Sequence, residues 1–254
     1  MRRQGFVPPP EGRNPIRCYT RGRGPVVTAL RFARRRRGYP GSHVEGRHPG
    51  AVAMKALVLN CTLKVSPARS NTGALAAVLG AKLREAGVEV DEARAVDYEI
   101  LPGVSSDEGD GDQWPSIRQR ILAAEILVFA SPTWLGRPSS VAQRVLERMD
   151  AMLSEQDDEG RPVAYNRVAG VVVTGNEDGA HHVISEVAGA LGDIGFTVPG
   201  QAWTYWNRGP GPGEDYLECD EGHEWSHSTG EAAAANLLAV ARALAANPIP
   251  APPG

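Results

Sequence analysis

Three polar loops, each placed directly after a short apolar run, carry the residues that could do chemistry. The first ends in Ser70-Asn71-Thr72, and the other two are Ser131-Pro132-Thr133-Trp134-Leu135-Gly136 and Thr174-Gly175-Asn176-Glu177-Asp178-Gly179. They combine hydroxyl and amide groups with glycines and one indole ring. A phosphate at the first loop and a flat heteroaromatic ring against the other two would use all three loops at once.

The first of these loops has the context of a phosphate site. An apolar run at 55–59 has the length of a strand, and Ser70-Asn71-Thr72 offers N-cap groups for a helix at 72–86. This order presents free backbone N–H groups and the positive end of a helix dipole to a ligand. An ordinary helix cap would explain the same three residues without a ligand.

Apolar runs of strand length alternate with helical patterns from Met54 onward. We expect strands at 55–59, 88–95, 126–130, 168–174 and 196–205, and helices at 72–86, 115–123, 139–153, 180–194 and 229–246. This alternation predicts an α/β fold, a doubly wound five-stranded parallel sheet with helices on both faces. Ligands bind such sheets beyond the carboxyl ends of the strands, where the three loops lie.

Charge divides the chain at about residue 54. Residues 1–53 carry twelve arginines, no lysine and two glutamates, whereas the remainder carries 15 basic and 28 acidic residues. We interpret 1–53 as a disordered extension, or as upstream sequence that is not translated, because Met54 directly precedes the first strand. A nucleic-acid-binding arm is disfavoured, because the segment shows no folded module and the domain that follows it is acidic. Residues 54–247 are then the folded domain and 248–254 a disordered tail.

Membrane and disulfide-rich classes are excluded by composition. No apolar run approaches the ~20 residues that cross a bilayer. Cys18, Cys61 and Cys219 are odd in number and have no CxxC spacing, which favours a reducing, cytoplasmic compartment. We expect no nucleic-acid partner and no membrane partner.

Two segments invite a metal site, and we predict none at either. The acidic run 107–112 is interpreted as a solvated loop, because Arg118 stands at the twelfth position, where a calcium loop has glutamate. Cys219, His223 and His227 recur every four residues, but Gly222 interrupts the segment and a structural zinc site usually needs a fourth ligand.

Two nucleotide-binding motifs are absent after the first strand. Neither G-x-G-x-x-G nor G-x-x-x-x-G-K-[ST] occurs there, which disfavours a dinucleotide-binding Rossmann site and a P-loop NTPase. A mononucleotide cofactor remains compatible with the three loops.

Taken together, the three loops, including Asn60-Cys61-Thr62 at the start of the first, resemble the flavodoxin-like NADPH-dependent FMN reductase family over about residues 54–204. The resemblance implies a flavodoxin-like fold and noncovalent FMN. Its phosphate would be held by Thr62, Ser70, Asn71 and Thr72. The backbone of Pro132, Thr133, Trp134, Leu135 and Gly136 would line the isoalloxazine, and Thr174, Gly175, Asn176 and Asp178 would flank its pyrimidine side. The first loop departs from the family, which commonly has Gly-Ser-Pro-Arg where this chain has Asn60-Cys61-Thr62-Leu63 and a longer insert.

The function implied by the resemblance is electron transfer from NADPH or NADH through FMN to a small acceptor, namely a quinone, a flavin, a nitro compound or a metal ion. Because the flavin carries the redox chemistry, we assign no catalytic acid or base. The resemblance also implies a homodimer or a homotetramer, which the family often forms. Two alternatives stay open: a flavodoxin-like electron carrier between protein partners, and a scaffold that has lost its cofactor. Late aromatic residues could cover the ligand, form a satellite core or make a dimer contact: Trp203, Tyr205, Trp206 and Trp225.

Overall fold

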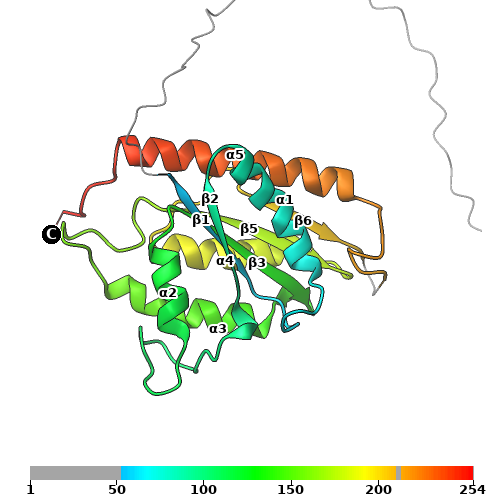
Figure 1. The fold of residues 1–254 in the computed structure, drawn as a ribbon, viewed down its shortest axis with the longest axis horizontal. Helices are drawn as coiled ribbons and strands as arrows, with labels where there is room; N and C mark the ends of the chain where they lie inside the picture. Colours follow the sequence, from blue (N-terminus) through cyan, green and yellow to red (C-terminus); the bar gives the residue numbers. More distant parts are fainter. Residues whose placement is uncertain (1–52, 210–212, 254) are drawn as a thin grey trace, which may run out of the picture. The chain divides into compact units, whose positions relative to one another are not determined.

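The central feature of the fold is a parallel sheet with the strand order β2-β1-β3-β5-β6 (Figure 1). The computed structural model describes residues 53–209 and 213–253, so the expectations for residues 1–52 lie outside it. The parallel strands are β1 Lys55–Asn60, β2 Glu89–Arg94, β3 Ile126–Trp134, β5 Val168–Gly175 and β6 Trp203–Asn207. With the short strand β4 (Arg137–Pro138) set aside, this is the flavodoxin-like order. The predicted doubly wound five-stranded sheet is confirmed.

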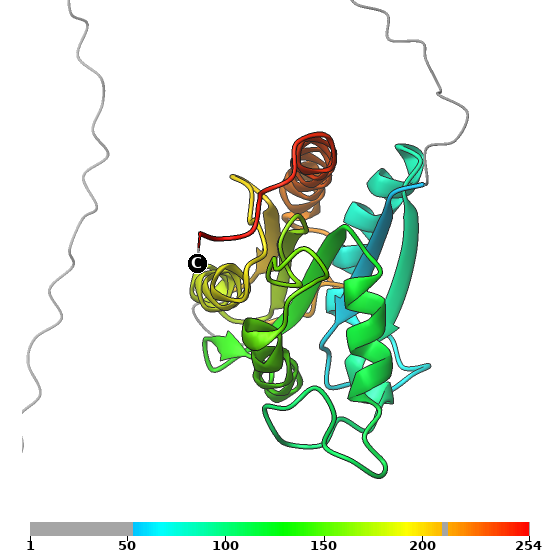
Figure 2. The ribbon, with the colours of Figure 1, turned by 90° about the vertical axis from the view of Figure 1, so that its left-hand side faces the viewer.

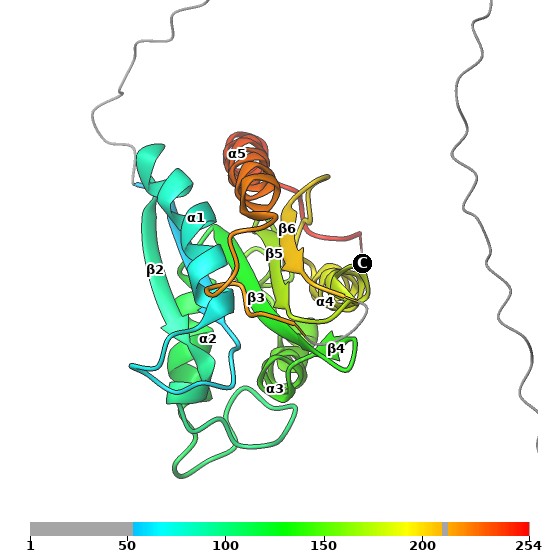
Figure 3. The same cartoon turned by 90° about the vertical axis from the view of Figure 1, so that its right-hand side faces the viewer.

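Helices cover both faces of the sheet, as Figures 2 and 3 show from its two sides. One face carries α1 Asn71–Glu85 and α5 His223–Ala246, and the other carries α2 Trp114–Leu122, α3 Ser140–Met149 and α4 Ala180–Ile194. Two short 3₁₀ helices, η1 Ala95–Asp97 and η2 Asp150–Ser154, complete the described elements. The buried residues therefore form two cores, one on each side of the strands.

The central strands are apolar throughout because each face of the sheet is covered. In β1, Leu57 and Leu59 join the core under α2, α3 and α4, while Ala56 and Val58 join the core under α1 and α5. Successive side chains of a strand point to opposite faces, so a strand buried on both sides is a continuous hydrophobic run. This is the pattern that the sequence displays in β1, β3 and β5.

Two predicted boundaries near the carboxyl end of the chain are wrong. Residues 196–202 are not part of β6, which begins at Trp203, because Pro199 and the positive φ of Gln201 (55°) turn the chain before it. Helix α5 begins at His223, six residues before the predicted Thr229, after Gly222 adopts a φ of 79°. The earlier start brings His223 and His227 onto a regular helix.

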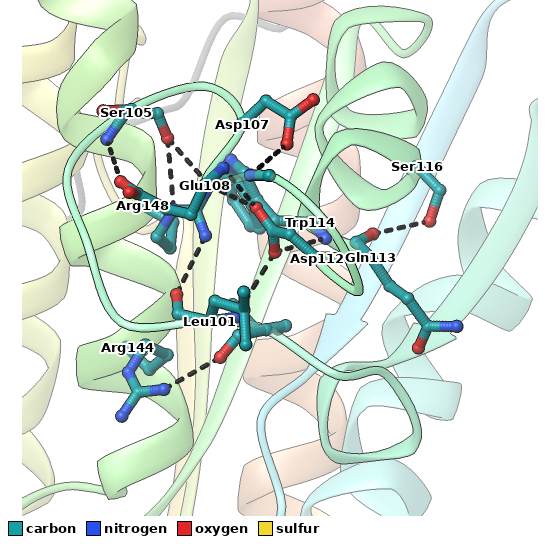
Figure 4. A network of polar contacts seen from close by, with 12 residues as sticks. Leu101, Ser105, Asp107, Glu108, Asp112, Gln113, Trp114, Ser116, Arg144 and Arg148 are labelled. Atoms are coloured by element: carbon teal, nitrogen blue, oxygen red, sulfur yellow. Dashed lines mark hydrogen bonds and ion pairs between the residues drawn. The ribbon is translucent and has the colours of Figure 1, made fainter.

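The acidic run 107–112 is not simply the solvated loop that we expected. The side chains of Asp112 and Arg148 are both fully buried, and Arg148 Nη2 lies 2.7 Å from Asp112 Oδ2 (Figure 4). Arg148 also donates to the carbonyl oxygens of Leu101 and Ser105. Its guanidinium is 5.8 Å from the ring centre of Trp114. One buried ion pair thus attaches the loop after β2 to helix α3.

The pKa of Asp112 reflects this position. Burial alone would raise it, but hydrogen bonds outweigh burial and lower the pKa to about 2. The donors are the Arg148 guanidinium and the backbone N–H groups of Glu108, Trp114 and Leu101. A buried carboxylate with this many donors stays ionised.

Candidate functional site

A pocket lies at the carboxyl edge of the sheet, where the loops after β1, β3 and β5 meet the start of α1. The space between its walls is about 530 Å³, including the part that opens to solvent. Its lining residues are Thr62, Leu63, Lys64, Asn71, Thr72, Pro132, Thr133, Trp134, Thr174, Gly175, Asn176, Trp206, Asp215 and Tyr216.

The start of α1 is fixed by Ser70, which is the N-cap residue. Its Oγ accepts a hydrogen bond from Gly73 N at 3.0 Å and another from Asn60 Nδ2 at 3.2 Å. A Cβ at Gly73 would come within 2.7 Å of Asn60 Nδ2, so glycine permits this close contact. Asn60 in turn accepts a hydrogen bond from Thr62 N. The hydroxyl of Ser70 is therefore used within the protein and is not among the pocket-lining groups.

Two hydroxyl groups join α1 to the end of β5. Thr72 Oγ1 and Thr174 Oγ1 lie 2.7 Å apart, and both side chains are buried. Asn71, at the first position of α1, accepts a hydrogen bond from Leu217 N at 3.2 Å. Lys64 Nζ lies 4.0 Å from Asp215 Oδ2, and both residues line the same pocket. Hydroxyl, amide and ammonium groups thus surround the helix N-terminus, which is a setting suited to an anion.

The second polar loop is partly a strand. We predicted that this strand ends at Ala130, but β3 continues to Trp134. It pairs with β4 through Thr133–Pro138 and Trp134–Arg137. The turn between them has positive φ at Leu135 (51°) and Gly136 (73°), the conformation of a tight two-residue hairpin. Trp134 lines the pocket, while Leu135 is 91% exposed at the hairpin tip.

Gly179 allows the β3–β4 hairpin to approach the third loop. Its φ is 111°, and a Cβ there would lie 2.7 Å from Gly136 Cα. Glu177 Oε1 accepts a hydrogen bond from Leu135 N at 2.5 Å. Backbone contact and this hydrogen bond hold the two loops together beside the pocket.

Thr133 and Gly175 form a close pair in the pocket wall. A Cβ at Gly175 would come within 3.0 Å of Thr133 Cβ. Thr133 Oγ1 is buried and has no hydrogen-bond partner among the described residues. A buried hydroxyl without a partner is costly, so its position beside a pocket favours a polar ligand there. Together with the helix N-terminus, these residues fit a phosphorylated heteroaromatic ligand.

One wall of the pocket comes from residues that the sequence did not assign to the site. Trp206 and Tyr216 pack edge to face, with ring centres 5.6 Å apart, and Trp206 Nε1 donates to the Glu221 carbonyl. Trp206 was predicted only as one of several late aromatics, and Lys64, Asp215 and Tyr216 were not predicted at all. Lys64, Asp215 and Tyr216 lie in irregular segments without a hydrophobic period, so no pattern in the sequence assigned them to the site.

The nine predicted residues that line the pocket are Thr62, Asn71, Thr72, Pro132, Thr133, Trp134, Thr174, Gly175 and Asn176. The four that do not are Ser70, Leu135, Gly136 and Asp178. Of these four, Ser70 caps α1, and Leu135 and Gly136 form the hairpin turn. The structure therefore brings parts of all three predicted loops together around one space.

Of the three residues that recur every four positions, Cys219, His223 and His227, the two histidines contact Tyr216. His223 Nε2 donates to the Tyr216 carbonyl at 2.9 Å, and His227 Nε2 lies 2.7 Å from Tyr216 Oη. Within residues 53–209 and 213–253, no three His, Cys, Asp or Glu side chains are grouped to hold a metal ion. A search of the same residues for a helix with the length and hydropathy of a membrane span also finds none.

Two relatives of this chain have names that refer to flavin phosphates. The 8-demethyl-8-aminoriboflavin-5'-phosphate synthase of Streptomyces davaonensis is 37% identical over 176 residues, 66% of this chain and 68% of that protein. The crystal structure of RosB with bound 8-demethyl-8-formylriboflavin-5'-phosphate aligns with a TM-score of 0.72 at 35% identity, over 78% of this chain and 82% of that one.

A second relative is much longer than this chain. The divalent metal cation transporter MntH of Mycobacterium bovis is 42% identical over 173 residues, 66% of this chain. The match spans only 25% of that protein.

The family itself is identified by a match over most of the folded domain. The model of the NADPH-dependent FMN reductases matches residues 54–210, which contain the three loops and the strands that carry them. The chain therefore belongs to the NADPH-dependent FMN reductase family, whose cofactor is FMN and whose co-substrate is NAD(P)H.

Proposed function

We propose that this protein is an FMN-dependent oxidoreductase that transfers electrons from NAD(P)H to a small acceptor, such as a quinone, a free flavin, a nitro compound or a metal ion. The observation that carries the proposal is the convergence of the three loops on one pocket at the carboxyl edge of the sheet. Membership of the FMN reductase family supports flavin-dependent oxidoreduction.

The phosphate of FMN would lie at the N-terminus of α1. Thr62, Asn71 and Thr72 line this end of the pocket, and Lys64 is the cation beside them. Ser70 would act indirectly, by holding the helix start in place. A dianionic phosphate gains from both the helix dipole and charge-assisted hydrogen bonds at such a position.

The ring of FMN would lie against the ends of β3 and β5. Pro132, Thr133 and Trp134 from the end of β3 and Thr174, Gly175 and Asn176 from the end of the adjacent β5 line the pocket there. When bound, FMN supplies the redox chemistry by accepting a hydride from NAD(P)H and returning electrons to the acceptor. The residues of this chain orient the ring and exclude water from its buried side. Trp134 is 52% exposed, so it borders the open side that a second substrate would enter.

The pocket also favours an enzyme over an electron carrier. Three aromatic residues from separate segments line it: Trp134, Trp206 and Tyr216. Such a lined, open pocket suits a small flat acceptor better than the surface of a protein partner. We place the activity in a reducing, cytoplasmic compartment, since Cys61 and Cys219 are free and buried. We also expect a homodimer or homotetramer.

A second candidate follows from the flavin-modifying relative. Its name states that it makes an aminoriboflavin phosphate, and this chain is 37% identical to it. By analogy, a flavin phosphate in the pocket would be the substrate rather than a resident cofactor.

Steady-state assays of the FMN-loaded protein distinguish these possibilities. We expect NADPH or NADH oxidation that depends on added quinone, with the mass of the extracted flavin unchanged after many turnovers. A flavin of altered mass would support the second candidate. Absence of turnover with every small acceptor would contradict the oxidoreductase and favour the carrier.

A further inference from the structure

Tyr216 stands between the pocket and two histidines of α5. It lines the pocket, is only 4% exposed, and its Oη lies 2.7 Å from His227 Nε2. The imidazole of His223 stacks on the phenol ring, with centres 4.1 Å apart, and donates to the Tyr216 carbonyl at 2.9 Å. The two histidines therefore fix both the plane of the ring and the position of the hydroxyl.

This arrangement links bulk solvent to the pocket wall through hydrogen-bonding groups. His227 is partly exposed on α5, whereas Tyr216 is buried. Burial raises the pKa of the Tyr216 phenol, so the phenol carries its proton at neutral pH. The charged residues beside Tyr216 in the pocket wall, Lys64 and Asp215, are paired with each other. A protonated phenol in the pocket wall therefore lies in hydrogen-bonding distance of a partly exposed imidazole.

Resting on the oxidoreductase function proposed above, we propose that Tyr216 gives a proton to carbonyl or quinoid acceptors in this pocket and that His227 restores it. Reduction of a quinone to a hydroquinone consumes two electrons and two protons. NAD(P)H, the reductant, supplies one hydride through the flavin. The second hydrogen must therefore come as a proton from another donor. The Tyr216 O–H bond breaks as the acceptor O–H bond forms. His227 then gives a proton from Nε2 to the phenolate oxygen and takes up another proton from solvent.

The choice of acceptor makes this relay testable. Benzoquinone needs protons when it is reduced, whereas ferricyanide accepts single electrons and needs none. The FMN-loaded protein is first reduced and then mixed with either acceptor in a stopped-flow instrument. In Tyr216→Phe, which keeps the stacked ring, we expect the rate with benzoquinone to fall about 100-fold and its solvent deuterium isotope effect to disappear. The rate with ferricyanide should stay within about twofold of wild type, since that reaction takes no proton from the protein.

His227→Gln provides the second variant, because glutamine can hydrogen-bond to the phenol but cannot pass a proton on. It should slow the benzoquinone reaction, by about tenfold, and leave ferricyanide unaffected. Tyr205→Phe is the matched control. Tyr205 lies in β6 and packs against Trp203, His181 and Trp225, and it is not among the residues that line the pocket. Its variant should match wild type with both acceptors.

An additional measurement does not depend on turnover. Ultraviolet titration of the apoprotein should show one tyrosine that ionises above the others, and Tyr216→Phe should lack it. Equal losses with both acceptors, or no loss with benzoquinone in either variant, would overturn the relay while leaving the oxidoreductase in place. If Tyr216→Phe does not fold, the two acceptors with His227→Gln decide the question. A wild-type protein inactive with both acceptors would overturn the relay and the proposed function together.

Discussion

The hydroxyl oxygens of Thr72 and Thr174 lie 2.7 Å apart, although 102 residues separate the two threonines along the chain. Thr72 belongs to the first turn of α1 and Thr174 to the end of β5. Their hydrogen bond joins the phosphate end of the proposed site to the ring end. The relative position of the two ends is thus set by the protein before any ligand binds.

Replacing one of these threonines should harm the protein more than replacing both. Thr174→Val leaves the buried Thr72 hydroxyl without its partner, which we expect to cost about 1–3 kcal/mol of unfolding free energy and to weaken FMN binding. The double variant Thr72→Val with Thr174→Val removes both polar groups and should recover most of the stability. Urea unfolding of Thr72→Val, Thr174→Val and the double variant measures this coupling. Strictly additive losses would show that the two hydroxyls do not act as a pair.

The contact between the hairpin and the third loop should tolerate no side chain at Gly179. Gly179→Ala places a Cβ against Gly136 Cα at a positive φ, so it should lower stability by about 1–3 kcal/mol and reduce FMN affinity. Gly189→Ala is the matched control, because Gly189 lies exposed within α4 and a Cβ there meets nothing within 4 Å. It should raise stability by about 0.5–1 kcal/mol. Equal effects of the two changes in thermal unfolding would refute the close contact.

The buried ion pair between Asp112 and Arg148 should dominate the stability of the loop after β2. Asp112→Asn leaves the Arg148 guanidinium buried without its counter-charge, so unfolding free energy should fall by about 3 kcal/mol or more. Asp110→Asn, at an exposed position of the same acidic run, should change it by less than about 0.5 kcal/mol. Chemical denaturation at neutral pH compares the two. Similar small effects would mean that the run is the solvated loop that the sequence predicted.

The ion pair between Asp112 and Arg148 also predicts how the unfolding free energy depends on pH. The pKa of Asp112 is lowered to about 2 in the folded protein, below the ~3.9 of an unfolded aspartate. Its contribution is therefore complete above about pH 4 and is lost as the pH falls towards 2, because the unfolded state binds the proton first. The unfolding free energy of wild type should drop more steeply between pH 4 and pH 2 than that of Asp112→Asn. Parallel pH profiles would contradict the lowered pKa.

Variants of Ser70 and Thr62 should distinguish the effect of helix capping on stability from the effect of pocket contacts on FMN binding. Ser70→Ala removes the cap of α1 and should cost about 1 kcal/mol of stability, with a small effect on FMN affinity once the protein is folded. Thr62→Ala, in the pocket lining, should weaken FMN binding with a smaller effect on stability. FMN titrations alongside thermal unfolding measure both quantities. The reverse pattern would place Ser70 in direct contact with the phosphate.

Local sequence patterns predicted the parts of the fold that depend on short-range chemistry. The apolar runs of β1, β3 and β5 and the cap residue Ser70 were readable because strand burial and helix capping act over a few residues. Since parallel strands end at one edge, the convergence of the three loops followed from their order alone. Nine of the predicted residues accordingly line one pocket.

The features that the sequence did not predict depend on distant partners. Asp112 looked like one more acid in a polar loop, and its burial depends on Arg148, 36 residues further along the chain. The position of Tyr216 depends on α5 and on Asn71, which binds the neighbouring Leu217 across 146 residues. Such contacts leave no periodic signal in the segments that make them.

The central claim is that the N-terminus of α1 holds the phosphate of FMN while the ends of β3 and β5 hold its ring. Titration of the apoprotein with FMN and with riboflavin, which lacks the phosphate, tests it most directly. We expect FMN to saturate one site per chain and riboflavin to bind about 100-fold more weakly, because it forgoes the charge-assisted contacts at the helix start. Equal affinity for the two flavins, or no binding of either, would contradict this account.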